Sequence, residues 1–412
     1  MGSGGDFTVT VTRKDIVAAV LPILEYWLPL SNLDLLLPPL DVSVFLCYKK
    51  PHESVNGGEN FTFGSMVRVL KEAMAQALVP YYAFGGEVLS NSLGEPELLC
   101  NNHGVDFLEA YADVKLKDLD LYNPDESIEG KLVPKKKHGV LSVQVTELKC
   151  GGVVVACTFD HRIADAYSTN ILTSSRAQQR QADPLISRLF YVMAEQIILL
   201  QTLAISKGSS YRRTKLESLT AFLWKMVAKS AAVVGNSNKQ ICKMGIVVDG
   251  RQRLSIGDED KETAMASYIG NVLSIAIGEK TIHELKEKPL SWVADAVHDY
   301  LEGAATKELF LGLIDWVEAH RPEPALTKIY CSSSSDEPAF VMSSGQRFPV
   351  SKVDFGWGRP ALGSYHFPWG GETGYVMPMP SPARDGDWVV YMHLLKGQMD
   401  LIEKEAAHIL GL

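Results

Sequence analysis

A histidine and an aspartate four positions apart are the residues whose chemistry stands out in this sequence. His161 and Asp165 follow the apolar, β-branched run 153–157, which predicts a strand buried on both faces. The spacing of apolar residues after His161 predicts a helix with Asp165 near its first turn. An imidazole held where a buried strand ends is shielded from bulk water and can act as a general base. Asp165 can either orient that imidazole or pair with a distant cation that fixes the loop.

The same spacing is compatible with an ordinary core histidine. The chain contains 10 His, so a His and an Asp at this separation arise readily by chance. In that case His161 would be a satisfied buried residue with no reaction to perform. A second segment, Asp354-Phe355-Gly356-Trp357-Gly358, favours the catalytic interpretation. It has no helix or strand periodicity, and two Gly around a Trp indicate a tight backbone path under a large ring.

With both segments present, the chain resembles the BAHD family of plant acyl-CoA-dependent acyltransferases. That family has His-x-x-x-Asp near mid-chain and Asp-Phe-Gly-Trp-Gly near the C-terminus. The resemblance extends in order through 30–34, 249–253 and 268–271. It implies an α/β fold of two chloramphenicol-acetyltransferase-like domains, each a mixed β-sheet flanked by helices, with the active site in a channel at their interface. We expect these domains at residues 1–180, with the His161 motif, and 181–412, with the Asp354 motif.

The resemblance also implies the reaction. An acetyl or hydroxycinnamoyl group would pass from acyl-CoA to the hydroxyl of a phenylpropanoid alcohol. The amino-acid sequence around His161 is most similar to that of family members that acylate coniferyl alcohol. His161 would take the proton from the acceptor oxygen and return it to the coenzyme A sulfur, with no covalent enzyme intermediate. Asp165 would be structural and would pair with Arg251 of the second domain.

Other residues take their expected roles from the same resemblance. The structural motif would comprise Asp354, Gly356, Trp357 and Gly358, away from the chemistry. The candidates for binding coenzyme A or the acceptor are Thr214, Tyr268, Gly270, Asn271 and Arg347. An ordinary turn and an ordinary helix cap are the alternatives for the first four. The chain departs from the family pattern at Ala166, where Gly is usual, at Gly345, where an aromatic residue is common, and in a shortened connection around 174–184.

Composition limits the remaining possibilities. A chain of 412 residues that is 46% hydrophobic and 22% charged is typical of a soluble globular enzyme. A net charge of −9 argues against nucleic acid as a partner. Six scattered Cys without Cys-x-x-Cys spacing indicate reduced thiols rather than a zinc site. No signal-peptide pattern, membrane-length apolar run or Gly-x-Ser-x-Gly occurs.

We therefore expect a cytoplasmic monomer without a metal or a permanently bound cofactor, and without a membrane or nucleic-acid partner. Acyl-CoA would be the co-substrate and a small-molecule alcohol the acceptor. Two alternatives stay open at this point. An amine acceptor would use the same base and yield an amide. A non-catalytic relative that binds acyl-CoA or a partner protein would account for Ala166, Gly345 and the short connection, but it would have no need for His161.

The patterns also predict where the elements lie. Strands are expected at 42–48, 141–148, 153–159, 241–248, 272–277 and 388–394. Helices are expected at 65–79 with Ser65 as the N-cap, from 214 with a Thr214–Glu217 capping box, and at 281–301, 304–318 and 398–410. The polar stretch 115–134 is expected to wrap over the surface.

Overall fold

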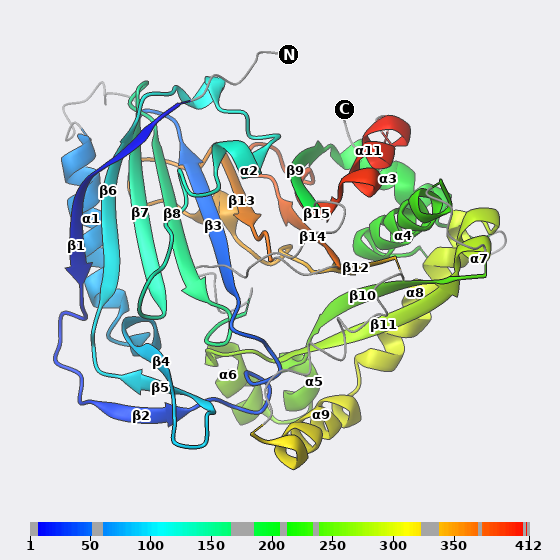
Figure 1. Cartoon of the computed structure of the whole chain (residues 1–412), viewed down its shortest axis with the longest axis horizontal. Helices are drawn as coiled ribbons and strands as arrows, with labels where there is room; N and C mark the ends of the chain where they lie inside the picture. Colours follow the sequence, from blue (N-terminus) through cyan, green and yellow to red (C-terminus); the bar gives the residue numbers. More distant parts are fainter. Residues whose placement is uncertain are drawn as a thin grey trace.

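Two six-stranded mixed sheets, each with its own helices, form the molecule (Figure 1). The computed structural model describes residues 7–51, 61–165, 185–206, 212–233, 239–322, 338–369, 373–406 and 409. The expected α/β fold of two mixed sheets flanked by helices is confirmed. The expected boundary at residue 180 lies outside the described residues and stays a prediction.

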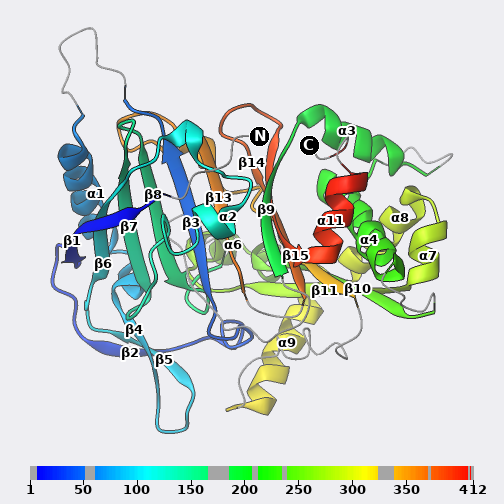
Figure 2. The same ribbon diagram turned by 45° about the horizontal axis from the view of Figure 1, so that its top comes forward.

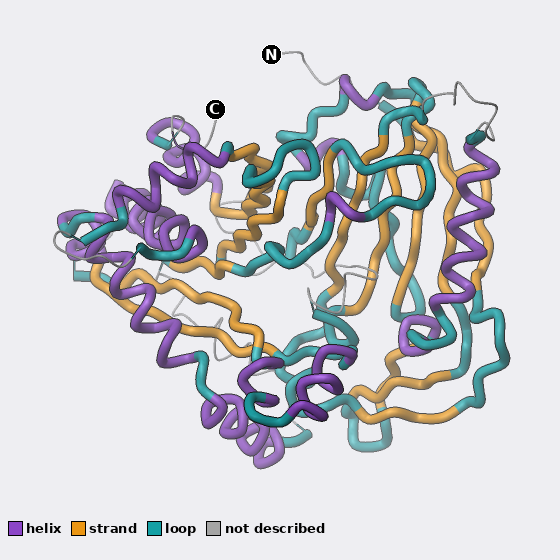
Figure 3. Tube along the Cα trace, turned by 180° about the vertical axis from the view of Figure 1, so that it is seen from behind, coloured by secondary structure: helices purple, strands orange, loops and turns teal. Residues whose placement is uncertain are grey.

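The first sheet is built mainly from the N-terminal half of the chain. In spatial order its strands are β1 (Val9–Val17), β6 (Val105–Ala112), β7 (Leu141–Leu148), β8 (Val153–Asp160), β3 (Asp41–Tyr48) and β13 (Leu362–His366). Helix α1 (Phe63–Ala77) covers its outer side, as the rear view in Figure 3 shows. The N-cap of α1 is Thr62, whose side chain accepts from the Ser65 backbone N–H. The prediction of Ser65 as N-cap was wrong, because Ser65 completes the reciprocal half of the same capping box.

The second sheet carries five of the ten α-helices in the described part of the chain. Its order is β11 (Leu273–Thr281), β10 (Ile241–Asp249), β12 (Ala339–Met342), β14 (Gly374–Pro380), β15 (Trp388–Leu395) and β9 (Leu185–Val192). The helices gathered on its outer side are α3 (Ala194–Leu203), α4 (Lys215–Val233), α7 (Ile282–Glu287), α8 (Leu290–Ala304) and α11 (Lys396–Glu405) (Figure 2). Trp224 of α4 is fully buried there and its indole N–H donates to the Cys242 carbonyl. This satisfied indole anchors α4 on the sheet.

Smaller elements complete the fold. A three-stranded sheet contains β2 (Tyr26–Pro29), β5 (Pro96–Cys100) and β4 (Glu87–Ser90). Helices α5 (Arg251–Ser255), α6 (Glu259–Ser267) and α9 (Lys307–His320) lie below the two main sheets in Figure 1. Short helical turns are α2 (Pro124–Ser127), η1 (Tyr82–Gly85), η2 (Leu116–Asp118) and η4 (Val350–Lys352).

A strand from the C-terminal half completes the first sheet. Strand β13 pairs antiparallel with β3, with Ser364 opposite Phe45. The side chains of β3 are buried almost without exception, so its edge needs a partner on that side. The two halves are therefore joined through main-chain hydrogen bonds as well as through side chains.

Two expected features differ in the structure, and a third lies outside the described residues. The prediction of a single helix at 281–301 was wrong. Helix α7 ends before Pro289, because Pro cannot continue a helix, and α8 begins at Leu290. The surface location of 115–134 was also wrong in part, since Ile128 and Leu132 are fully buried. The helix expected after Asp165 falls outside the described residues, whereas 161–163 form a turn.

Candidate active site

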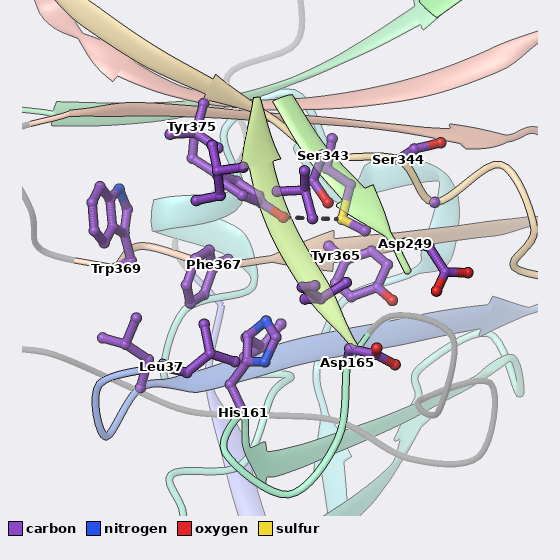
Figure 4. Close-up of a pocket in the computed structure, with 18 of the residues that line it drawn as sticks. Leu37, His161, Asp165, Asp249, Ser343, Ser344, Tyr365, Phe367, Trp369 and Tyr375 are labelled. Atoms are coloured by element: carbon purple, nitrogen blue, oxygen red, sulfur yellow. Dashed lines mark hydrogen bonds between the residues drawn. The ribbon is translucent and has the colours of Figure 1, made fainter. Parts of the chain in front are cut away.

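A cavity of about 360 Å³ lies between the two sheets. Its lining combines residues of the leader before β3, the end of β8, strands β10 to β12, the 343–348 loop and the segment after β13. Most of these side chains are apolar, with leucines and aromatic rings the commonest among them, and His161 projects into the same cavity (Figure 4). The cavity is thus apolar, with a few polar groups of the kind that orient a ligand.

His161 is positioned by the turn that ends β8. Its backbone N–H donates to the Leu40 carbonyl at 2.8 Å, which ties the turn to the leader. Asp160, which precedes His161, also stabilises the turn, since its carboxylate lies 2.6 Å from the guanidinium of Arg162. The imidazole points into the cavity (Figure 4) and lies between the rings of Phe159 and Phe367, with centroids 6.3 and 6.5 Å away.

The surroundings of His161 favour its neutral form. Burial lowers the pKa of the imidazole below its ordinary value of 6.5, an effect larger than the opposing influence of the nearby carboxylates of Asp165 and Asp160. Within the described part of the chain, Nδ1 has no hydrogen-bonding partner. A neutral imidazole offers one nitrogen lone pair for a proton, which is the state a general base requires.

Asp165 is turned toward Arg251 rather than toward the imidazole. Its two carboxylate oxygens accept from Arg251 Nη1 at 2.6 Å and Nη2 at 3.1 Å, and Figure 4 shows the carboxylate directed away from the His161 ring. Asp165 is fully buried and Arg251 is 3% exposed. The geometry is bidentate, the arrangement in which an arginine–carboxylate pair is most directional. The structure therefore brings together the two residues for which a structural pairing was predicted.

A second set of hydrogen bonds joins the His161 turn to both halves of the chain. The Asn271 side-chain amide donates to the His161 carbonyl at 2.8 Å and to Asp34 Oδ1 at 3.0 Å. The backbone N–H of Asn271 donates to the same Asp34 oxygen at 2.6 Å. Asp34 is held in turn by the Ser31 hydroxyl at 2.6 Å. Asn271 therefore supports the His161 turn from behind, and it is not among the residues that line the cavity.

Sequence reasoning did not identify this network as such. Asp34 entered only as part of a family-like segment, and Asn271 only as a candidate binding residue. The sequence did contain a signal for this network. Asp34 stands among three leucines, at positions 33, 35 and 36, and is buried with them. A buried carboxylate needs hydrogen-bonding partners.

The other candidate binding residues fall in different places. Gly270 has φ +142 and its carbonyl accepts from Arg251 at 2.8 Å, while the Tyr268 ring occupies the space that a Cβ at Gly270 would enter. The Tyr268 carbonyl also accepts from Arg251 Nη2 at 3.4 Å, so both residues support Arg251. Thr214 caps α4 through the predicted box, in which its backbone N–H donates to Glu217 at 2.6 Å and its hydroxyl accepts from the Glu217 N–H at 3.2 Å. Thr214 does not belong to the cavity lining.

Arg347 lies at the solvent side of the cavity. Its side chain is 61% exposed, and Nη1 lies 3.2 Å from Asp249 Oδ2. The neighbouring Gly345 also lines the cavity, and a Cβ built there would meet Met379 Cγ at 2.7 Å. An aromatic side chain at this position would require Met379 to move, so the local packing accounts for the departure from the family pattern.

The Asp354 segment lies far from His161. Asp354 Oδ1 accepts from the backbone N–H groups of Gly356 and Gly358 at 2.8 and 2.9 Å. Both glycines have positive φ, 104 and 106, a region that favours Gly. Trp357 packs against Tyr48 with ring centroids 6.1 Å apart. Tyr48 is at the opposite end of β3 from the strand end paired with Asp160, a separation of about 23 Å along the strand.

The part of the chain that the structure describes shows neither a cluster of metal ligands nor a membrane-spanning helix. Those residues contain no group of three or more His, Cys, Asp or Glu side chains arranged to hold a metal ion. None of their helices is long and apolar enough to cross a bilayer.

Solved structures share this two-sheet architecture. Vinorine synthase covers 96% of this chain and 97% of its own, with a TM-score of 0.74 and 17% sequence identity. The structure of F. sporotrichioides TRI101 complexed with coenzyme A and T-2 covers 92% of this chain and 97% of its own, with a TM-score of 0.71 and 13% identity. These likenesses establish the fold.

Comparison with protein sequences then gives the family. The model described as "Transferase family" matches residues 7–190 and 172–409. Shikimate O-hydroxycinnamoyltransferase of Nicotiana tabacum is 25% identical, covering 91% of this chain and 93% of that protein. Anthranilate N-benzoyltransferase protein 2 of Dianthus caryophyllus is 25% identical, covering 91% and 94%.

A third relative extends the range of acceptors. (Z)-3-hexen-1-ol acetyltransferase of Arabidopsis thaliana is 26% identical, covering 77% of this chain and 81% of that protein. Fold and sequence together define an acyltransferase that uses acyl-CoA. The chain belongs to the BAHD family of these enzymes, as its two motifs predicted.

Proposed function

We propose that this enzyme transfers an acetyl or hydroxycinnamoyl group from acyl-CoA to the hydroxyl of a phenylpropanoid alcohol such as coniferyl alcohol, with His161 as general base. The observation that carries the proposal is the neutral imidazole directed into an apolar cavity of about 360 Å³. That volume and the aromatic walls suit a planar alcohol of this class. Coenzyme A in the TRI101 structures supports acyl-CoA as the donor.

The proposed reaction needs one proton acceptor and no covalent intermediate. His161 removes the proton from the acceptor hydroxyl as its oxygen attacks the thioester carbonyl. When the tetrahedral intermediate collapses, the carbon–sulfur bond breaks and the imidazolium returns the proton to the coenzyme A sulfur. Holding both substrates beside the imidazole supplies much of the rate enhancement, and the base contributes a further factor of about 10²–10⁴.

Asp165 has a positioning role in this proposal. The buried Asp165–Arg251 pair and the Asn271–His161 hydrogen bond hold the two ends of the 161–165 turn. The imidazole can therefore face the cavity without a carboxylate partner of its own. A base supported in this way keeps a lowered pKa, because a hydrogen-bonded carboxylate would raise it.

The test is the release of free thiol from acetyl-CoA and from p-coumaroyl-CoA, with and without coniferyl alcohol. Wild type should release thiol only when the acceptor is present, and His161→Ala should reduce the rate by about 10²–10⁴. His103→Ala is the matched control, since its side chain is 44% exposed and does not line the cavity. Full activity of His161→Ala would refute the base assignment.

The same assay separates the other functions. The amine analogue of coniferyl alcohol tests amide formation, for which the similarity to an anthranilate N-benzoyltransferase gives a reason. Acyl-CoA binding without thiol release with either acceptor would support the non-catalytic alternative.

A further inference from the structure

Each charged side chain that lines the cavity contacts a side chain of opposite charge. Among the described lining residues, the charged groups are Asp165, Asp249, Arg251 and Arg347, and no lysine is present. Arg251 Nη1 lies 2.6 Å from Asp165 and 3.3 Å from Asp249, and Arg347 lies 3.2 Å from Asp249. Two guanidinium groups thus face two carboxylates, and their charges balance.

This balance decides what a charged acceptor would meet. A carboxylate entering the cavity loses its hydration and needs a cation in exchange. The Arg251 guanidinium is held by Asp165 in a buried bidentate pair, and Arg347 contacts Asp249 from the solvent side with 61% of its side chain exposed. An anionic acceptor would also approach the Asp249 carboxylate itself, and that like-charge contact opposes binding.

The rest of the lining is suited to an apolar molecule. Leu37, Phe367 and Trp369 lie on one side of His161, and Asp249 lies on the other (Figure 4). The Phe367 and Trp369 rings are stacked with their centroids 6.5 Å apart, and Tyr375 meets Phe367 edge-on at 5.0 Å. An aromatic or long apolar body can pack against these rings while its hydroxyl reaches the imidazole.

We infer that the acceptor site takes uncharged alcohols with an apolar body and excludes acceptors that carry a carboxylate, and that Asp249 sets this preference. The inference rests on the proposed function and narrows its acceptor class. Asp249 acts by occupying Arg347 and by placing a negative charge on the cavity wall. Replacing this carboxylate with an amide would leave Arg347 as a cation without its ion-pair partner at the mouth of the cavity.

The experiment compares two acceptors that differ by one charge and one methyl group: cinnamyl alcohol with a para methyl ester and the same alcohol with a para carboxylate. The ratio of their kcat/KM values is measured by thiol release from acetyl-CoA at pH 7.5 and low salt. Wild type should prefer the ester by roughly 100-fold. Asp249→Asn should reduce that ratio by roughly tenfold, because Arg347 becomes available to the carboxylate.

Asp249→Asn preserves the local backbone contact, since Oδ1, which accepts from the Arg251 N–H at 3.1 Å, is retained in the amide. Asp260→Asn is the matched control. It removes the same charge from an exposed position on α6, and the ester-to-acid ratio should equal that of wild type. The ester-to-acid ratio of wild type alone tests whether the site excludes a carboxylate.

The outcomes distinguish this inference from the function on which it rests. An ester-to-acid ratio within about threefold in wild type, or a ratio unchanged in folded Asp249→Asn, would overturn the assignment of Asp249 while leaving an alcohol acyltransferase intact. If neither acetyl-CoA nor p-coumaroyl-CoA releases thiol with these two alcohols or with coniferyl alcohol, both proposals are overturned. A strong ester preference that weakens only in Asp249→Asn supports the inference.

Discussion

Breaking the Asp165–Arg251 pair should destabilise the protein far more than it alters the chemistry. The pair is fully buried on the Asp165 side and 3% exposed on the Arg251 side, with contacts of 2.6 and 3.1 Å. Removing one member of such a pair costs about 3–5 kcal/mol, because the other charge stays buried. For halves of this size, each kcal/mol shifts the melting temperature by about 2–4 °C. Asp165→Ala should therefore melt roughly 6–20 °C lower than wild type.

The assay combines thermal unfolding with thiol-release kinetics on the fraction that remains folded. The double variant Asp165→Leu/Arg251→Met should recover much of the lost stability, because a well-packed apolar pair can replace a buried ion pair. Asp400→Ala is the control, since Asp400 and its partner Lys396 are both 53% exposed and such a pair contributes under about 1 kcal/mol.

One result would refute the reasoning. If Asp165→Asn kept the wild-type melting temperature while kcat fell by about 10³-fold or more, Asp165 would act on the imidazole and not on the architecture. A shift in the acid limb of the pH profile of the same variant would point the same way.

The remaining predictions concern the turn, the distant motif and two histidines. Asn271→Ala should lower the free energy of unfolding by about 1–3 kcal/mol, measured in urea, because the buried Asp34 and the His161 carbonyl each lose a donor; unchanged stability would contradict the network. Trp357→Ala should cost about 3–5 kcal/mol in the same assay, with KM for both substrates unchanged at 25 °C, and an altered acceptor KM would count against a purely structural motif. The acid limb of kcat/KM should have its midpoint below pH 6.5, because the neutral His161 is active and burial lowers its pKa; a midpoint above 6.5 would contradict this. Burial lowers the pKa of His393 to about 4, so the unfolded chain binds this proton first as pH falls, and stability should drop by roughly 3 kcal/mol between pH 6.5 and 4. His393→Gln should flatten that dependence, and an equally steep loss in the variant would assign it to other groups.

Much of the fold was accessible from local patterns. The β7–β8 hairpin follows from alternation before Gly151–Gly152 and an apolar run after it, and it delivers His161 at the end of β8 as predicted. The capping box of α4 was also predictable, because Thr214 and Glu217 have the required spacing. Such features depend on residues close together in the chain.

Features that depend on distant residues were harder to predict. Nothing near Leu362–His366 indicates that this strand joins β3, and the burial of Ile128 and Leu132 within a polar stretch is set by what packs over it. Asn271 was expected to bind a ligand because of the family resemblance. Its contacts with Asp34 and His161 could not be predicted, because they join three separate segments of the chain. Arg347 was expected near the acceptor, but its contact with Asp249 is a tertiary property that no spacing reveals.

The placement of β13 has a consequence for how the chain is made. Strand β3 is complete early in synthesis, yet its outer edge has no partner until Leu362–His366 leaves the ribosome. The side chains of β3 are buried on both faces of the sheet, so its unpaired edge is apolar. An unpaired apolar edge can pair with other chains. The first sheet can therefore be completed only after most of the chain has been synthesised. In a protein cut into its two halves, the N-terminal half would have the same unpaired edge, so that half would be the one prone to aggregate.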